Sequence, residues 1–307
     1  MAIKQEIWKK DIQELLLNDN NLFINRSINH DADIVGRVVH IPQAGANGAI
    51  SVDRSSFPAT AALRTDTDLT YTVKSYSIDP VHVLNFDEVQ LSYNKRMSVM
   101  GAQIKAINER MGLEAAFSWG ISAVAGKIIR TTGAGGATQP SGTTGTRKKL
   151  TVDDFRKAVE VLDIDNVPSY GRVAVMQTNM YYELFGTDAL LRKDYGYGNS
   201  LPTGVINTLF GVDIYVRPEV VGYDNTGAAN NNGTIKAVGS AYGTTDSFGC
   251  IIYQEGCVAK AMSAPQVYFD NKNPLFYGDV ISAEVFMGST KMRTDNKGLV
   301  AIAQANV

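Results

Sequence analysis

The sequence predicts an α+β fold, and three features of the chain support this prediction. Residues 87–119 repeat apolar side chains at the period of one long helix. Residues 37–84 alternate apolar and polar side chains, as strands do, and residues 150–307 mix helical and strand patterns. The chain has 307 residues, of which 44% are hydrophobic and 20% charged, so it can bury a substantial core.

Composition narrows the class of function. The formal net charge is -2, so the chain lacks the overall basic balance of dedicated nucleic-acid binders. No run approaches roughly 18 consecutive apolar residues, and the N-terminal residues are polar and basic, so we expect neither a membrane span nor a secretory signal. The two cysteines, Cys250 and Cys257, lie in apolar segments at a spacing that fits neither a redox pair nor a zinc site. We expect both to be buried thiols.

Residues 1–36 have the pattern of an arm. A short helix is expected over residues 3–17, and the polar residues 18–21 end it. Its apolar stripe consists of Trp8, Ile12, Leu15 and Leu16. The segment is too short to bury a core of its own, so the stripe must be covered by another surface.

Residues 37–84 predict a long two-stranded excursion. The first strand begins at Val38 and Val39, is interrupted at residues 42–48, and resumes its alternation at Ile50 and Val52. The returning strand has the clearest period of two in the chain, with Leu69, Tyr71 and Val73 as its apolar members. An isolated hairpin is marginally stable in water, so we expect this one to lie on something else.

The long helix over residues 87–119 carries one continuous apolar stripe. Its members are Val89, Tyr93, Met97, Met100, Ile104, Ile107 and Met111. A helix of this length would span about 50 Å. Gly101 and Gly112 either weaken it or allow close packing.

The second half of the chain predicts a mixed α/β region. Residues 131–149 are rich in Gly, Thr and Ser, which predicts a flexible loop. Thr151 is placed to cap a helix whose stripe includes Phe155 and Leu162. A strand at 171–176, a short helix near 178–185 and further strands follow. The further strands are expected at 212–216, 248–253, 257–262, 280–287 and 298–303.

None of the candidate catalytic or metal-binding motifs has the sequence context that its chemistry requires. The three histidines are not spaced as zinc ligands. A calcium-loop beginning at Asp31 lacks two required oxygen ligands, and residues 116–120 resemble a nucleophile elbow but end a helix. The glycines of 133–145 do not form a phosphate loop. We therefore expect no enzyme activity, no cofactor and no metal site.

The order of these elements resembles the Hong Kong 97-type capsid fold, found in major capsid proteins of tailed double-stranded DNA phages. Residues 85–93 are similar to the junction before the family's spine helix, and residues 171–185 to the start of its axial (A) domain. Residues 276–282, continued by Gly288, Arg293 and residues 298–301, resemble the strands that close its peripheral (P) domain.

The resemblance implies a division of the chain into parts. These are an N-arm at 1–36, an extended β-hairpin (the E-loop) at 37–84, the spine helix with part of the P-domain at 85–130, the A-domain with its Gly-rich loop at 131–262, and C-terminal P-domain strands at 263–307.

The resemblance also implies a function. The chain would be a structural capsid protein of the virion that self-assembles, as hexamers and pentamers, into an icosahedral head around double-stranded DNA, with which it has only non-specific proximity. Scaffolding, portal and decoration proteins are expected partners, and a membrane is not. Two alternatives stay open: an encapsulin-like cellular shell, whose characteristic N-terminal pattern is absent, and a soluble α/β enzyme with an unrecognised site.

Contacts between subunits are expected from the arm and the excursion. The arm would contribute Trp8, Ile12, Leu15 and Leu16, and the excursion would contribute Asp53, Arg54, Arg64, Asp66, Asp68, Leu69, Tyr71 and Val73. The charges of the excursion are mixed in sign, which suits ion pairs at an interface rim.

Some capsid proteins of this fold join subunits through an isopeptide bond between an E-loop lysine and an asparagine. Candidate acceptors exist here at Asn271, Asn273 and Asn296. The nucleophile must be an amine, and no lysine lies between Ile41 and Val73. We therefore expect a shell held without covalent bonds.

Overall fold

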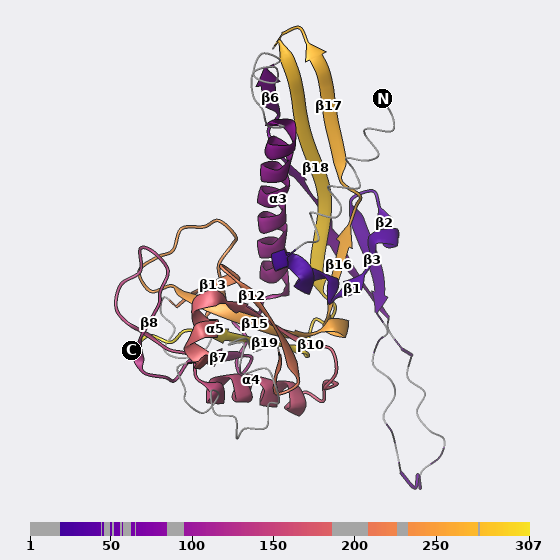
Figure 1. The fold of residues 1–307 in the computed structure, drawn as a ribbon. Coiled ribbons are helices and arrows are strands. Elements are labelled where there is room, and N and C mark those ends of the chain that lie inside the picture. Colours follow the sequence, from indigo (N-terminus) through magenta and orange to yellow (C-terminus); the bar gives the residue numbers. More distant parts are fainter. Residues whose placement is uncertain are drawn as a thin grey trace.

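A computed structural model describes residues 19–43, 45, 50, 52–55, 57, 63–64, 66–84, 95–185, 208–225, 233–275 and 277–307. Within these residues the strands form an eight-stranded, a six-stranded, a three-stranded and a two-stranded sheet. The long helix α3 runs along the six-stranded sheet and reaches the eight-stranded sheet with its C-terminal end (Figure 1). The predicted α+β class is confirmed.

Helix α3 spans Lys95–Trp119. The predicted stripe is buried where its side chains are described, at Ile104, Ile107 and Met111. Residues 85–94, which include the expected first turns, lie outside the described residues. The helix ends at Trp119, whose indole N–H donates to the carbonyl of Ala259 at 3.2 Å. The segment 116–120 is therefore a buried helix end and not a nucleophile elbow.

The six-stranded sheet is built around the longest strand. β18 (Gly278–Lys291) pairs along one edge with β17 (Gln266–Asn273) and β16 (Val258–Met262), and β16 pairs with the short β1 (Ile28–Asn29). Along its other edge β18 pairs with β6 (Val81–Leu84) and β5 (Lys74–Ser77). Strand β17 was not among the expected strands.

The eight-stranded sheet contains most of the remaining strands. Its main path is β11 (Thr208–Leu209), β12 (Val212–Arg217), β10 (Arg172–Gln177), β15 (Ser247–Gln254), β13 (Val221–Asp224) and β14 (Thr234–Ile235). β19 (Leu299–Ala303) pairs with β15 and with β7 (Ile128–Arg130). The strands expected at 171–176, 212–216, 248–253 and 298–303 are confirmed.

The last two expected strands, at 280–287 and 298–303, are both present but lie in different sheets. β18 belongs to the six-stranded sheet, whereas β19 lies in the eight-stranded sheet beside β15. All five residues of β19 are buried, because this strand is covered on both faces. A continuous apolar run fits such a central position, and nothing in it indicates which of two sheets it joins.

Two helices cover one face of the eight-stranded sheet. α4 (Val152–Ile164) buries the predicted stripe, and Thr151 caps it in a capping box with Asp154. α5 (Thr178–Phe185) follows β10 directly. In β15, Cys250 and Ile252 face these helices, while Ile251 and Tyr253 face α3. Both cysteines are buried, as expected.

The Gly-rich segment 131–149 is not a flexible loop, contrary to the prediction. It forms a small hairpin of β8 (Gly135–Ala137) and β9 (Arg147–Lys148). Arg147 is 2% exposed, and it donates to the carbonyls of Thr144, Thr244 and Asp246 at 3.0–3.2 Å. Main-chain bonds from Thr144 to Thr244 and from Lys148 to Ala305 add to these contacts, so long-range hydrogen bonds hold a segment whose composition indicates disorder.

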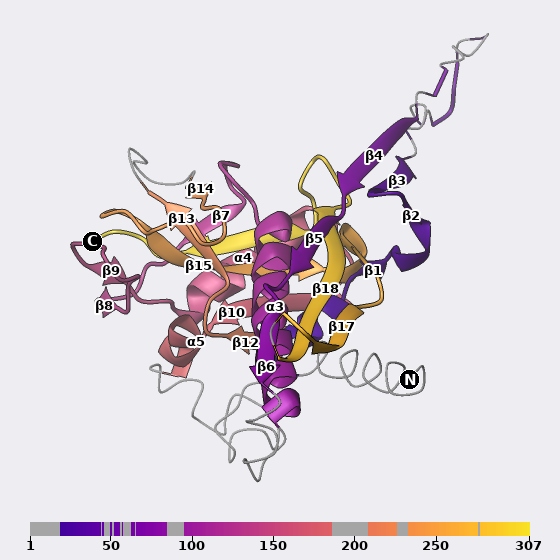
Figure 2. The same cartoon turned by 90° about the horizontal axis from the view of Figure 1, so that it is seen from above.

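The three-stranded sheet is the base of the predicted excursion. It consists of β2 (Ile34–Val35), β3 (Val38–Gln43) and β4 (Thr67–Thr72), with β3 and β4 antiparallel. This sheet projects to one side of the molecule, as seen from above in Figure 2. The expected renewed strand at Ile50 and Val52 is wrong, because neither residue lies in a strand.

Candidate assembly surfaces

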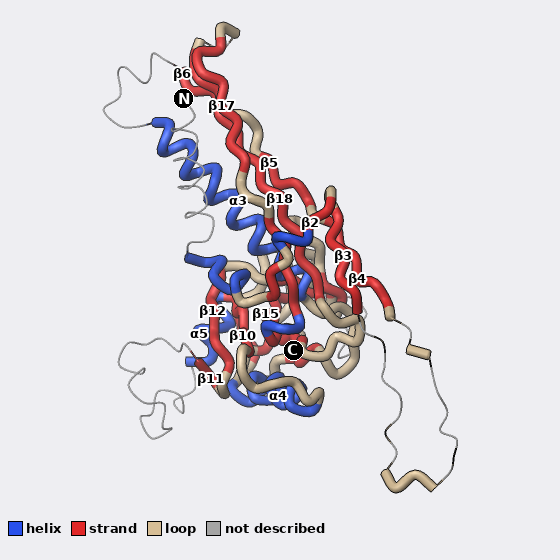
Figure 3. Tube along the Cα trace, turned by 90° about the vertical axis from the view of Figure 1, so that its right-hand side faces the viewer, coloured by secondary structure: helices blue, strands red, loops and turns tan. Residues whose placement is uncertain are grey.

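The base of the excursion packs on its own chain. Tyr71 and Val73 are buried with Val39 and Ile41 against Ala261 of β16. Leu69 is half-buried beside them. The expectation that these side chains await a neighbouring copy is therefore wrong for Tyr71 and Val73, because the inner face of the hairpin lies on the six-stranded sheet. Figure 3 shows β3 and β4 alongside that sheet.

The distal part of the excursion, residues 45–66, differs sharply from this base. Its described apolar side chains are almost fully in solvent. They are Ile50, Val52, Phe57 and Leu63, which are 95%, 84%, 78% and 94% exposed. Single exposed apolar residues are ordinary, but a segment that exposes all of them is typical of an interaction surface.

The predicted charges of the excursion are partly used within the hairpin. Arg64 Nε lies 2.6 Å from Asp66 Oδ1, and the main-chain N–H of Gly45 donates to the same oxygen at 2.8 Å. These two donors lower the pKa of Asp66, with the Gly45 bond the larger cause. Asp68 Oδ2 lies 2.8 Å from His40 Nδ1.

Asp53 and Arg54 have no ion-pair partner among the described residues, and Asp53 has a positive φ of 47°. Both side chains are exposed. Of the five predicted charged residues, these two are the ones that the hairpin leaves free within the described part of the chain.

The structure describes only the second half of the predicted arm. The predicted stripe of Trp8, Ile12, Leu15 and Leu16 lies outside the described residues. Residues 19–35 form η1 (Asp19–Asn25), β1, η2 (Asp31–Asp33) and β2, and of these η1 packs on the chain's own core. This segment has no core of its own, as expected, and its buried apolar side chains, Phe23 and Ile24, join the main core of the same chain.

Phe23 anchors the arm to the core of the subunit. Its side chain is 0% exposed and meets Trp119 edge-to-face, with ring centroids 5.8 Å apart. The hydroxyl of Tyr253 donates to the carbonyl of Phe23 at 2.8 Å. Apolar spacing could not predict this contact, because the short run Leu22–Ile24 between polar residues has no helical or strand period.

A second exposed apolar site lies at the tip of the ribbon formed by β17 and β18. Leu275 and Tyr277 are each 81% exposed in the turn that joins the two strands. This tip is far from the eight-stranded sheet (Figure 1). The sequence analysis missed it because β17 itself was missed, although Val267 and Phe269 alternate with polar residues there.

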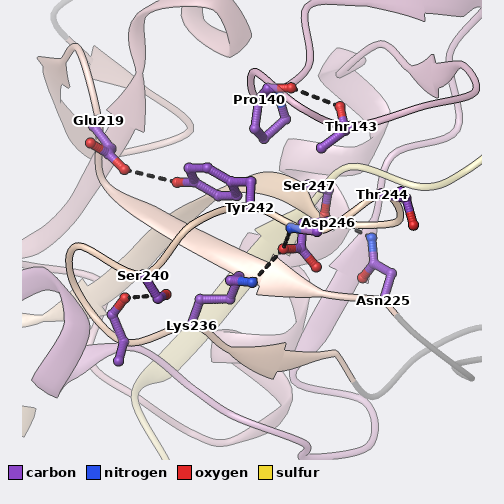
Figure 4. Close-up of polar contacts among 12 residues, drawn as sticks. Pro140, Thr143, Glu219, Asn225, Lys236, Ser240, Tyr242, Thr244, Asp246 and Ser247 are labelled. Atoms are coloured by element: carbon purple, nitrogen blue, oxygen red, sulfur yellow. Dashed lines mark hydrogen bonds and ion pairs between the residues drawn. The ribbon is translucent and has the colours of Figure 1, made fainter.

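A cluster of polar side chains at the edge of the eight-stranded sheet holds a loop in place (Figure 4). None of its described contacts pairs a nucleophile with a general base. Asp246 accepts from Lys236 Nζ and from the main-chain N–H of Gly243. Tyr242 donates to Glu219 at 2.8 Å, and burial together with this bond raises the pKa of the Tyr242 phenol. These contacts fix residues 236–246 against the sheet.

The described residues offer little for metal or thiol chemistry. No three His, Cys, Asp or Glu side chains in this part of the chain are grouped to hold a metal ion. Burial raises the pKa of Cys250 to about 12 and also raises that of Cys257. Among the described residues, no helix combines the length and apolar character that a membrane crossing requires.

Comparisons with known proteins identify solved structures that share this fold. No protein-family model matches the chain, and a search of curated proteins finds no significant match. Solved structures do match along most of the chain. The capsid structure of cyanophage P-SCSP1u has a TM-score of 0.65 at 16% identity, covering 94% of this chain and 90% of that one.

Two further structures agree. The mature capsid of bacteriophage PhiM1 has a TM-score of 0.61 at 14% identity and covers 93% of this chain and 87% of its own. The capsid of cyanophage Pam1 has a TM-score of 0.60 at 13% identity, with coverages of 91% and 88%. Such identities establish the fold and no more, and the fold of this chain is the fold of these phage capsid proteins.

Proposed function

We propose that this chain is the major capsid protein of a tailed double-stranded DNA phage. Many copies would tile an icosahedral head, as hexamers and pentamers, around the packaged genome. The fold supports this role because capsid structures match over 94% of the chain. The role is structural and requires no catalytic residue, cofactor or metal.

The strongest support for this function is the difference between the buried base of the excursion and its exposed distal residues. Its base is anchored by Tyr71 and Val73, whereas the distal residues expose every described apolar side chain. A free monomer gains nothing from a projecting apolar segment, and exposed apolar surface favours aggregation. In a shell the same segment would lie across an adjacent copy and be buried.

The parts of the chain follow from the same proposal. The excursion would be the E-loop, α3 the spine helix, the six-stranded sheet the P-domain, and the eight-stranded sheet the A-domain. On this assignment β16 belongs with the P-domain and β19 with the A-domain, so the predicted boundary after residue 262 would move to before β16, and the last strand would return to the A-domain. Residues 1–18 would contact a neighbouring subunit.

The charges at the distal end fit such a contact. Asp53 and Arg54 are exposed and opposite in sign, so they can pair with charges on an adjacent copy and fix its register. Scaffolding, portal and decoration proteins would be further partners of the shell.

Imaging the purified protein tests this function. Closed, uniform shells are expected by negative-stain electron microscopy, and shells isolated from a phage lysate should absorb strongly at 260 nm because they hold DNA. Shells that hold protein and no nucleic acid would instead indicate an encapsulin-like compartment. A small, monodisperse oligomer without shells would contradict the proposal.

A further inference from the structure

The chain passes from the excursion into the six-stranded sheet at a single residue. β4 ends at Thr72 and β5 begins at Lys74, so Val73 alone separates a strand of the three-stranded sheet from a strand of the six-stranded sheet. The main-chain N–H of Val73 donates at 2.8 Å to the carbonyl of Arg37, which immediately precedes β3. Contacts that fix the chain around Val73 therefore fix both strands of the hairpin relative to the six-stranded sheet.

Gly288 of β18 lies against this crossing. The pairing of β5 with β18 ends at Lys74 and Met287, so Gly288 is the next residue along β18. A Cβ atom at position 288 would lie 2.9 Å from the carbonyl oxygen of Thr72 and 3.1 Å from the ring of Tyr71. Gly288 does not have a positive φ, so the close approach of the hairpin, and not a backbone conformation, requires glycine here.

The residue that pairs with Gly288 across the sheet is also small. Ala261 of β16 is directly opposite Gly288, is fully buried, and belongs to one buried cluster with Tyr71 and Val73. Residues directly opposite each other on adjacent antiparallel strands share a face of the sheet. Gly288 and Ala261 therefore form a flat platform on which the ring of Tyr71 lies, and any larger side chain at position 288 would raise the hairpin from it.

Two further contacts attach β3 to the same stretch of chain. Just before the strand, the guanidinium carbon Cζ of Arg37 lies 5.9 Å from the ring centroid of Phe286 on β18. At the last residue of the strand, Gln43 Nε2 donates to the carbonyl of Met292, which immediately follows β18. Strand β3 is thus held at both ends, and the platform supports the hairpin between them. Together these contacts determine a direction for the hairpin.

We propose that Gly288 is a positioning residue for the excursion, because the close contact of Tyr71 and Thr72 with its backbone sets the direction in which the hairpin projects (Figure 2). A methyl group at position 288 would lift the hairpin at its base, and a small displacement at the base of a projection is magnified at its far end. This direction is a property of the subunit alone. Its consequence for assembly, that a redirected excursion misses the adjacent copy, rests on the proposed function.

Pulsed electron paramagnetic resonance on the isolated subunit tests this direction. Spin labels at Thr67→Cys on β4 and Ile164→Cys on α4 report it, because both positions are exposed and the native cysteines are buried. Gly288→Ala should shift the mean distance between the labels. The matched control is Gly101→Ala, which adds the same methyl group where nothing lies within 4 Å and should keep the wild-type distance. Equal distances in the two variants would overturn the proposal.

A second variant tests the attachment of the hairpin without adding an atom at position 288. Gln43→Ala removes the hydrogen bond to Met292, so the distribution of label distances should become wider than in the wild type. Thr70→Ala changes an exposed side chain on the paired strand β4 and should keep the wild-type width. A distribution of unchanged width in Gln43→Ala would mean that the contacts at the base do not determine the direction of the hairpin.

Shell yield, measured by sedimentation, separates this inference from the proposed function. Gly288→Ala should form fewer shells than Gly101→Ala, because its excursion points away from the adjacent copy. Equal shell yields from these variants, with the hairpin shifted in the first, would overturn the link between direction and assembly. A wild-type protein that forms no shells would contradict the proposed function, and the label distances would still decide the positioning role of Gly288.

Discussion

Lys74 Nζ lies 3.0 Å from Glu114 Oε2, and this ion pair joins β5 to α3 at the base of the excursion. Glu114 also accepts from Arg110 Nη2 at 2.8 Å, so one carboxylate serves two cations. Lys74 is the only lysine of residues 37–84, and it is engaged with its own subunit. Between Ile41 and Val73 the only lysine or arginine side chains are Arg54 and Arg64.

The first prediction is a shell without covalent links between subunits. An amine must lose its proton to attack an amide, and arginine does not do so under physiological conditions. Boiled particles should therefore run as one band near 33.3 kDa on a denaturing gel. A ladder that survives reducing agent would contradict this, and its loss in Lys74→Met would identify the nucleophile.

The second prediction concerns the distal excursion. Phe57→Ser combined with Leu63→Ser should leave the free energy of unfolding of the subunit within about 0.5 kcal/mol of the wild type, because both side chains are exposed. Shell yield should fall at least about tenfold, because the apolar contact with the next copy is lost. Yield is measured by sedimentation.

The matched control is Ile164→Ser at the end of α4, where the side chain is 76% exposed. It should assemble at the wild-type level. Equal yields from the excursion variant and this control would refute an assembly role for Phe57 and Leu63.

The third prediction is that Arg147 stabilises the Gly-rich hairpin. Arg147→Met leaves the carbonyls of Thr144, Thr244 and Asp246 without their donor, which should cost about 3 kcal/mol of unfolding free energy. Urea denaturation measures the change. Lys148→Met, at the next position of β9, should change it by less than about 0.5 kcal/mol. Similar values for the two variants would mean that Arg147 is not the residue that orders the hairpin.

The fourth prediction concerns the cysteines. A thiolate is the reactive form, and burial raises the pKa of Cys250 to about 12. At pH 8 the native subunit should therefore resist alkylation at Cys250 and Cys257, and both should react once the protein is unfolded. Rapid labelling of Cys250 in the native subunit would show that the core around β15 opens.

The sequence predicts those elements whose apolar side chains repeat at one period. The stripe through Ile104, Ile107 and Met111 indicates α3 because a helix of that length must bury one face. The alternation at Leu69 and Tyr71 likewise indicates β4. Neither pattern tells which surface covers it, so burial within the chain and burial against a neighbour cannot be separated at this level.

The features that the sequence does not predict depend on long-range polar contacts. Arg147 is ordered by carbonyls near residue 244, and Arg217 by an asparagine at position 21, almost two hundred residues away. Composition around Arg147 is that of a flexible loop, and composition around Asn21 is that of an exposed arm. In each case a buried guanidinium makes contacts that the local composition does not indicate.

A cryo-electron microscopy reconstruction of the assembled particle tests the central claim most directly. The account predicts an icosahedral shell in which residues 45–66 of each subunit lie across an adjacent copy and bury Ile50, Val52, Phe57 and Leu63. Tyr71 and Val73 should remain packed on their own subunit. A particle in which residues 45–66 project into solvent, or a protein that forms no shell under any assembly condition, would contradict the account.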